Sequence, residues 1–464
     1  MYASLLRISG ALYLSVFEQP ARRGLFQHPA RMILSWVLLA MLLLTPGTAS
    51  ARIDIDINAP GIQKLKIAIP DFVDLSKEER NPQLAAALPG VVSNDLDMAG
   101  YFTPMDKASF LDANNPSLTS DGIRFKDWSV IGADLLLKGA YSCIGQSVEV
   151  EVRLFDVFRG QQILGKRILG KVDEHRNLMH RIGNDIFYLL TGQQGMFLSK
   201  LAFVGNASGQ KEIYVADYDG YNVQQITFDK SIALFPRWSP QADKLFYNSF
   251  KEGQGPMLYM RDMATGKTTK VSGRKGLNTG AAFPPHQRYL ALTLTEGDNM
   301  DIYTIDFAGN IVKRLTSVWG INVSPTFSPD ATKMAYVSNR SGSPQIYVQN
   351  VEDGREERIT FEGRYNTSPS WSSLNRIAYA GMEDGRFEIF TINPNGGGLR
   401  KITGNNGNHG NNEDPCWYAN GRYLVFSSNR DGGYRLYLAM ANGFNPKKIN
   451  IVMKGEQTCP SWSP

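Results

Sequence analysis

Histidine and cysteine are scarce in this sequence, which limits the chemistry that the chain can perform. The 464 residues include five histidines and three cysteines. The Gly-x-Ser-x-Gly turn that presents a nucleophilic serine in α/β-hydrolases does not occur anywhere in the chain. Zinc sites draw on clustered Cys and His, and catalytic triads use a histidine base. We therefore expect a binding protein without turnover, with no catalytic residue, no cofactor and no metal site.

The few candidate metal ligands have ordinary structural explanations. His175 and His180 are five residues apart on an expected helix, whereas two ligands on one helix face need a spacing of four. We expect both side chains to be exposed. His409 lies in a run of Gly and Asn, which favours a flexible loop. Asp217 and Asp219 precede a glycine between two strand patterns, which favours a hairpin turn, with a calcium site as the alternative.

Long apolar runs are also rare, and one of 12 residues stands out at 33–44 (ILSWVLLAMLLL). Arginines precede it and Ala49-Ser50-Ala51 follows it, which is typical of a signal peptide. It is shorter than the roughly 20 residues that span a bilayer. We expect residues 1–51 to be removed before Arg52, leaving an exported chain that does not span the membrane. The adjacent Arg22 and Arg23 leave a twin-arginine route open as the alternative to general secretion.

Charge of one sign is not in excess. Removing residues 1–51 leaves 45 basic residues (49 − 4) and 43 acidic residues (44 − 1), and the two signs are interspersed. Nucleic-acid-binding proteins cluster their basic residues, so we expect no nucleic-acid partner.

A period of about 44 residues is the strongest feature that is present. An aromatic residue that ends a strand pattern recurs at intervals of 44 to 46 residues, at Trp238, Phe283, Phe327, Trp371, Trp417 and Trp462. Each copy carries four short strand patterns, as a propeller blade does. The first copy, from Leu201, lacks the leading strand, and the chain ends on an unmatched one. Residues 196–464 therefore predict a six-bladed β-propeller closed by the C-terminal strand.

Two cysteines share a position in this repeat. Cys416 and Cys459 each precede a blade aromatic, so they fall on neighbouring innermost strands. Either they form a disulfide or they are two small buried thiols, and spacing alone does not decide between these.

Residues 52–195 lack the repeat and predict a small α/β domain. We expect strands over 64–69, 134–141, 148–155 and 161–168. One helix begins after Asn81-Pro82 and ends at Gly100, and a second covers about 173–190, before Gly192. The short segment 192–195 joins this domain to the propeller.

Two segments are candidate binding sites. In Arg52, Ile53, Asp54, Ile55, Asp56, Ile57 and Asn58, isoleucine alternates with polar residues. This pattern predicts a strand that either adds to a partner's sheet or forms an edge of its own domain. The second candidate is a set of asparagines five residues before the blade aromatics, Asn278, Asn322 and Asn366, preceded by Gly276, Gly320 and Gly363. These loops ring one mouth of the expected channel, and support of a turn is the alternative role.

The domain order and several short motifs resemble the TolB family of the Tol-Pal cell-envelope system. The motifs are Asp127-Trp128 with 131–134, the junction 190–197 leading into 200–204, and the blade signature 325–330 (PTFSPD). Two turns depart from that signature, at Pro284-Pro285-His286 and at Tyr418-Ala419-Asn420.

The resemblance implies a non-catalytic, monomeric periplasmic protein with two partners. Its propeller would bind the peptidoglycan-associated lipoprotein Pal, and its N-terminal end would bind TolA. We expect Pal at the mouth ringed by Asn278, Asn322 and Asn366, and TolA on the arm Arg52–Asn58. Such a protein helps to keep the outer membrane attached during cell division. The alternative function is a periplasmic hydrolase of the peptidase or glycosidase type that contains a propeller.

Overall fold

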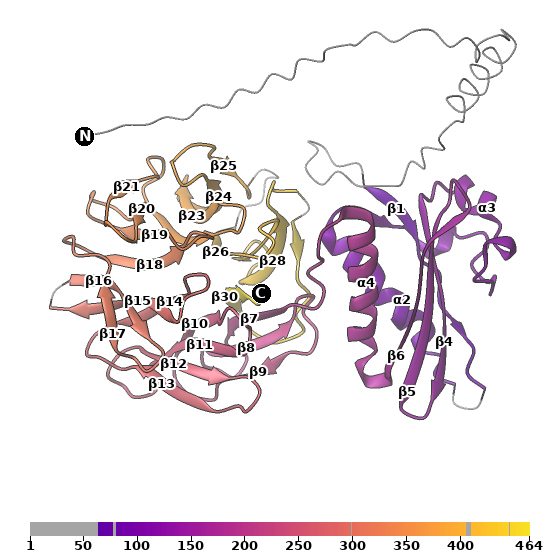
Figure 1. Ribbon diagram of the computed structural model, residues 1–464, viewed down its shortest axis with the longest axis horizontal. Coiled ribbons are helices and arrows are strands. Elements are labelled where there is room, and N and C mark those ends of the chain that lie inside the picture. The colour runs from indigo at the N-terminus through magenta and orange to yellow at the C-terminus, as the bar shows by residue number, and fades with distance from the viewer. Residues whose placement is uncertain (1–63, 78–79, 298, 405–409, 445) are drawn as a thin grey trace, which may run out of the picture. The chain divides into compact units, whose positions relative to one another are not determined.

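The computed structural model describes residues 64–77, 80–297, 299–404, 410–444 and 446–464 (Figure 1). The expected signal peptide and the arm Arg52–Asn58 lie outside these residues, as does His409. Within the described ranges, no helix is long and apolar enough to cross a membrane.

The N-terminal domain is built on a six-stranded mixed sheet with the order β3-β1-β4-β5-β6, in which β2 also pairs with β4. Its strands are β1 (Leu65–Ala68), β2 (Val73–Asp74), β3 (Phe102–Pro104), β4 (Leu135–Ile144), β5 (Ser147–Asp156) and β6 (Gln161–Lys171). Strands β4, β5 and β6 form an antiparallel meander, whereas β1 runs parallel to β3 and β4. Alternate residues of β5, including Val148, Val150 and Val152, are fully buried, as expected for a strand with one covered face.

Two helices, α2 (Leu84–Ala99) and α4 (His175–Thr191), pack against each other. Both end where expected, because Gly100 and Gly192 adopt left-handed backbone conformations with φ of 82° and 68°. The shorter elements are α3 (Phe125–Val130) and the 3-10 turns η1 (Lys107–Ser109), η2 (Ser120–Gly122) and η3 (Val172–Glu174). The expected second helix thus begins with the single turn η3.

The C-terminal part forms six four-stranded antiparallel sheets, which confirms the predicted propeller (Figure 1). In sheet order the blades are β10 (Ala233–Trp238), β11 (Lys244–Ser249), β12 (Met257–Asp262), β13 (Thr268–Ser272); β14 (Asn278–Ala282), β15 (Tyr289–Glu296), β16 (Asn299–Asp306), β17 (Ile311–Arg314); β18 (Asn322–Phe327), β19 (Lys333–Ser338), β20 (Gln345–Asn350), β21 (Glu356–Arg358); β22 (Asn366–Trp371), β23 (Ile377–Glu383), β24 (Arg386–Ile392), β25 (Arg400–Lys401); β26 (Asn412–Trp417), β27 (Tyr423–Ser428), β28 (Arg435–Met440), β29 (Lys447–Lys448); and β30 (Gln457–Trp462), β7 (Lys200–Gly205), β8 (Glu212–Asp217), β9 (Gln224–Gln225).

The last blade joins the two ends of the propeller. Strand β30 pairs antiparallel with β7, with Trp462 opposite Leu201. Next to this pair, the amide of Lys200 donates to the Ser463 hydroxyl at 2.8 Å, and the Ser463 amide donates to the Lys200 carbonyl at 2.9 Å. The prediction that the C-terminal strand closes the ring is confirmed.

The recurring aromatics fill the space between neighbouring blades. Trp238 is 7% exposed and packs with residues of the preceding blade, such as Val204 and Ile213, and of its own blade, such as Leu245. Trp417 repeats this arrangement between its own blade and the one before it. The six blades are therefore stacked through one large side chain each, and the 44-residue period reflects that contact.

Deleting residues 455–464, and with them β30, should destabilise the propeller strongly. The deletion exposes the edge of β7 and removes the buried Trp462, and truncating a buried Trp to Ala alone typically lowers the free energy of unfolding by about 3–5 kcal/mol. Chemical denaturation should show at least that loss, and size-exclusion chromatography should show self-association. Deleting the exposed Pro464 alone is the control, and equal stability of the two truncated proteins would contradict the closure.

Candidate functional site

The innermost strand of each blade begins at one mouth of the channel, and the predicted asparagines occupy that position. Asn278, Asn322 and Asn366 are the first residues of β14, β18 and β22. The glycines before them, Gly276, Gly320 and Gly363, all have positive φ. Two further members of this ring, Asn412 and Gln457, begin β26 and β30 and were not among the predicted residues. The same offset of five residues from Trp417 and Trp462 would have found both.

These asparagine side chains are buried, between 0% and 1% exposed, and they hydrogen bond inside the propeller. Asn366 donates from Nδ2 to Gln345 Oε1 at 2.8 Å, and the Thr360 hydroxyl donates to the same oxygen at 2.8 Å. Gln345 and Thr360 belong to the blade before that of Asn366. One buried acceptor therefore links an asparagine of one blade to a hydroxyl of its neighbour.

The same link recurs at two other blade junctions. Asp301 Oδ1 accepts from Asn322 Nδ2 at 3.1 Å and from the Thr316 hydroxyl at 2.8 Å. Glu388 Oε2 accepts from Asn412 Nδ2 at 2.8 Å and from a threonine hydroxyl of its own blade. We call this contact the inter-blade clasp. In each of the three clasps, the threonine follows the outermost strand of one blade and the asparagine begins the innermost strand of the next.

Asn278 differs, because Met257 stands where the three blades that form a clasp have the acceptor Asp301, Gln345 or Glu388. Its Oδ1 accepts from the Ser272 hydroxyl at 2.7 Å and from the Arg274 amide at 3.0 Å, within its own loop. The structure thus places all three predicted asparagines beneath the surface of the mouth. Their part in partner binding stays a prediction, and it would act through the loops that they hold.

Large apolar side chains are exposed on four of the six loops that lead into the innermost strands. These residues, here called the apolar rim, are Phe228, Ile232, Trp319, Ile321, Phe361, Tyr365 and Val452, and they are 40–83% exposed. Solvent-exposed aromatic residues grouped around a concavity are typical of interaction surfaces. Six of these residues occupy two positions of the repeat, because Phe228, Phe361 and Val452 lie ten residues before a blade aromatic and Ile232, Ile321 and Tyr365 lie six residues before one. The period could therefore have located them, whereas Trp319 has no apolar counterpart in the other blades.

Below the rim, every innermost strand carries a bulge. Its third residue has a left-handed backbone conformation in all six blades, with φ between 50° and 76°, at Phe235, Gly280, Ser324, Ser368, Asp414 and Cys459. Pairing with the second strand shifts register at the same place. In five blades a proline follows, and since proline has no N–H it interrupts the ladder of hydrogen bonds.

Cys416 and Cys459 are free thiols in this structure. The backbone amide of Trp462 approaches Cys416 Sγ at 3.4 Å. Burial raises the pKa of both thiols, which keeps them protonated and poorly nucleophilic.

At the far ends of the innermost strands lies a cavity of about 870 Å³, lined by the blade aromatics, by prolines and by Arg237.

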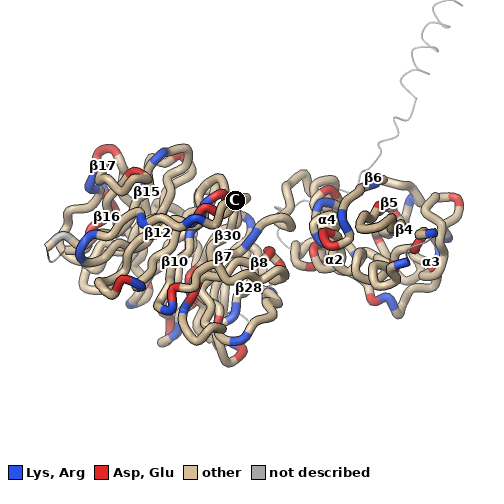
Figure 2. Tube along the Cα trace, turned by 90° about the horizontal axis from the view of Figure 1, so that it is seen from below, with Lys and Arg blue, Asp and Glu red and all other residues tan. Residues whose placement is uncertain are grey.

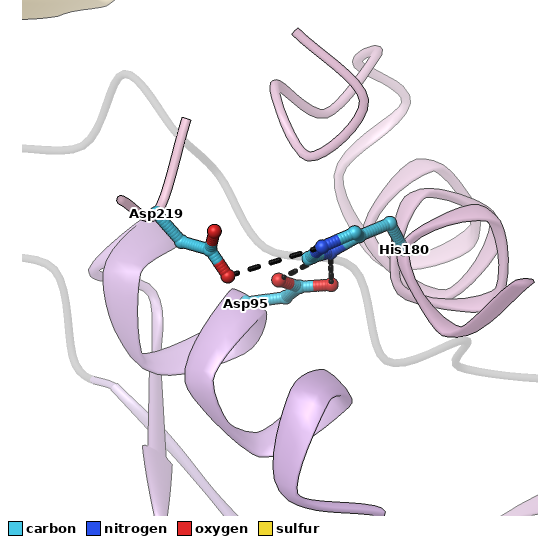
Figure 3. A group of neighbouring side chains, drawn as sticks. All are labelled: Asp95, His180 and Asp219. Atoms are coloured by element: carbon cyan, nitrogen blue, oxygen red, sulfur yellow. Dashed lines mark hydrogen bonds and ion pairs between the residues drawn. The ribbon is translucent and has the colours of Figure 1, made fainter. Parts of the chain in front are cut away.

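A second polar cluster lies where the N-terminal domain contacts the propeller (Figure 3). His180 from α4 hydrogen bonds through Nδ1 to both carboxylate oxygens of Asp95 from α2, each at 2.9 Å. Its Nε2 faces Asp219 Oδ2 at 3.8 Å, and Asp219 lies in the turn after β8. The expectation that His180 is exposed is wrong, because the side chain is 1% exposed. Helical spacing predicts which residues share a face of α4. It does not predict that α2 and the turn after β8 cover that face at His180.

Asp217 and Asp219 lie in a hairpin turn, as expected, but they have different partners. Asp217 forms an ion pair with Lys200 at 2.8 Å. Asp219 forms an ion pair with Arg176 of α4, so the turn also contacts the N-terminal domain. Other contacts across this boundary are the Tyr423 hydroxyl to the Ala99 carbonyl, at 3.0 Å, and the Lys447 ammonium to the Asp97 carbonyl, at 2.8 Å.

Charged residues are otherwise interspersed along both domains, and the described part of the chain shows no extended stretch of one sign (Figure 2).

Two family models match the chain in the order in which the domains occur. The TolB amino-terminal domain matches residues 53–163, and the TolB beta propeller domain matches residues 187–464. The chain belongs to the TolB family.

Individual relatives agree with this membership. The chain is 39% identical over 269 residues to the Tol-Pal system protein TolB of Desulfosudis oleivorans, a match that covers 57% of this chain and 60% of that protein. It is 36% identical over 206 residues to the Tol-Pal system protein TolB of Syntrophotalea carbinolica, covering 44% of this chain and 48% of that protein. The matched stretches thus span about half to three-fifths of these relatives. The crystal structure of TolB from Acinetobacter baumannii superposes with a TM-score of 0.75 at 26% identity, covering 89% of this chain and 100% of that one.

The inter-blade clasp predicts that Asn366→Ala lowers stability. The substitution leaves Gln345 Oε1 and the Glu362 carbonyl without the donor that they share, which should lower the free energy of unfolding by about 1–3 kcal/mol. Urea denaturation measures the loss. Asn395→Ala, in an exposed turn of the same blade, is the matched control and should change stability by less than about 0.5 kcal/mol. Equal stability of both variants would show that the clasp contributes nothing.

Proposed function

We propose that this TolB-family protein is a periplasmic binding module of the Tol-Pal system that acts without catalysis and carries two partner sites. Its propeller binds the lipoprotein Pal and its N-terminal arm binds TolA, which links the two partners and supports outer-membrane integrity during division. Family membership supports envelope proteins as the partners. The observation that carries the proposal is the apolar rim, because a propeller of this family exposes large apolar side chains around one channel mouth.

The rim and the asparagines have complementary roles in this proposal. Asn278, Asn322 and Asn366 hold the ends of the loops from below, and the exposed side chains above them contact Pal. Trp319 and Phe361 are 78% and 72% exposed, so both have apolar surface to bury against a partner. The loops are anchored on rigid strands, so less conformational entropy is lost when the partner binds.

The arm has a separate role that follows from its alternation. Ile53, Ile55 and Ile57 would lie on one face of a strand, with Asp54 and Asp56 on the other. Such a strand adds to the edge of a partner's sheet through backbone hydrogen bonds, and the isoleucine face enters apolar positions of that partner. We propose that TolA is bound in this way, and that binding at the propeller is coupled to release of the arm.

Trp319→Ala and Phe361→Ala should each weaken Pal binding by about 1–3 kcal/mol, or roughly 5- to 150-fold in Kd. Calorimetry with the soluble domain of Pal measures the affinity. Phe158→Ala is the control, since Phe158 is 93% exposed but lies on the β5–β6 hairpin of the N-terminal domain. If both rim variants remain folded and bind Pal like the parent protein, the proposed surface is wrong.

Deleting Arg52–Asn58 should abolish TolA binding and leave Pal affinity within a few fold of the parent. A sharper pair of variants separates the two faces of the arm. Serine at positions 53, 55 and 57 should weaken TolA binding as strongly as the deletion, whereas asparagine at positions 54 and 56 should have a much smaller effect. Unchanged TolA affinity in the deletion variant would exclude the arm, and equal losses in the two substituted proteins would exclude an isoleucine-specific face.

A further inference from the structure

His180 is enclosed by groups from three segments of the chain, and its two ring nitrogens face different domains (Figure 3). Nδ1 faces Asp95 of α2 at 2.9 Å, within the N-terminal domain. Nε2 makes no hydrogen bond among the described residues and points toward Asp219 of the propeller at 3.8 Å. The three side chains are each at most 1% exposed, so water does not compensate them.

The charges around His180 come from every element packed against it. Helix α2 contributes Asp95, α4 contributes Arg176, and the turn after β8 contributes Tyr218 and Asp219. Burial raises the pKa of Tyr218 well above that of a free phenol, so its hydroxyl keeps its proton and donates to Asp95 at 2.5 Å. Burial raises the pKa of Asp95 too, while the hydrogen bonds from His180 and Tyr218 act in the opposite direction.

We take both aspartates as ionised in this contact, because Asp95 accepts hydrogen bonds from Tyr218 and His180 and Asp219 pairs with Arg176. Two negative charges then stand against one positive charge, that of Arg176. A neutral His180 that donates from Nδ1 would leave one negative charge uncompensated. It would also turn a bare Nε2 lone pair toward the Asp219 carboxylate, and a buried polar atom without a partner is destabilising by about 1–3 kcal/mol. A second ring proton removes both problems, because it balances the charge and gives Nε2 a donor.

We infer that His180 is an imidazolium that bridges the two domains, forming a proton-dependent latch between α2 of the N-terminal domain and the β8–β9 turn of the propeller. The latch is complete while the proton is present. Loss of the proton as the pH rises leaves excess negative charge in a buried contact, so higher pH favours separation of the two domains and lower pH favours the closed arrangement.

A divalent metal ion fits this position less well than a proton. A ligated histidine commonly donates its other nitrogen to a carboxylate, as His180 does to Asp95. However, the Asp219 oxygen that would be the second ligand already pairs with the Arg176 guanidinium. An added ion would lie beside that fixed positive charge, and the same oxygen would have to serve both cations.

Nuclear magnetic resonance of residues 52–464 with histidine labelled by ¹⁵N tests the protonation state directly. The His180 signals, assigned with the His180→Gln variant, should show protons on both ring nitrogens at pH 7.5, where a free imidazole is mostly neutral. A single protonated nitrogen would overturn the inference. One equivalent of bound zinc that disappears in His180→Gln would overturn it in favour of a metal.

A double-mutant cycle tests whether the proton joins the domains. The rate of protease cleavage at the junction 192–195 reports how often the domains separate, when reclosing is fast. His180→Gln and Asp219→Asn should each raise this cleavage rate. The increase in the double variant should be at least 10-fold smaller than the product of the two single increases. That coupling should decrease between pH 6.5 and pH 9.

His175→Gln provides the matched control. His175 is on the same helix, but its Nδ1 pairs with the Val172 carbonyl at 2.8 Å, within the N-terminal domain. The increase in cleavage rate in the double variant His175→Gln with Asp219→Asn should equal the product of the two single increases. Equal coupling for His175 and His180, or coupling for His180 that does not change with pH, would show that the proton does not form the latch.

Discussion

The structure depends on one constraint, which is that a ring of sheets must have no open edge at its seam. The seam is the pairing of β30 with β7, which joins residues more than 250 positions apart in the sequence, such as Trp462 and Leu201. Each blade is a small sheet with two faces to bury, and it can do so only between two neighbours. The aromatic contacts and the inter-blade clasps therefore require the seam, since without it the first and last blades would each lose a neighbour.

Features that recur were predictable from the sequence alone. The six aromatics, the closing strand and the starting positions of the asparagines all follow from the 44-residue period, because the same packing problem is solved once per blade. The burial of Asn366 was not predictable in this way, since its acceptor on Gln345 belongs to the preceding blade. Spacing locates a side chain on a strand, but it does not say which group lies opposite.

Features that occur once were missed, and for a related reason. Trp319 has no counterpart in the other blades, so the register gives no sign of it. His180 depends on Asp95, which is 85 residues away in sequence, and on a turn of the propeller. Only the docking of α2, α4 and the β8–β9 turn brings these groups together. In this chain, the recurring parts follow the period, and the parts that occur once lie in loops and at the contact between the two domains.

The bulges of the innermost strands have a consequence for anything that enters the channel. These strands have free edges facing the lumen, and a free edge normally accepts a further strand through its backbone. Here each edge bends at a left-handed residue, and in five blades a proline removes the next amide hydrogen. An inserted segment therefore finds no continuous backbone template. Such a segment would have to be recognised through its side chains rather than by continuation of a blade's sheet.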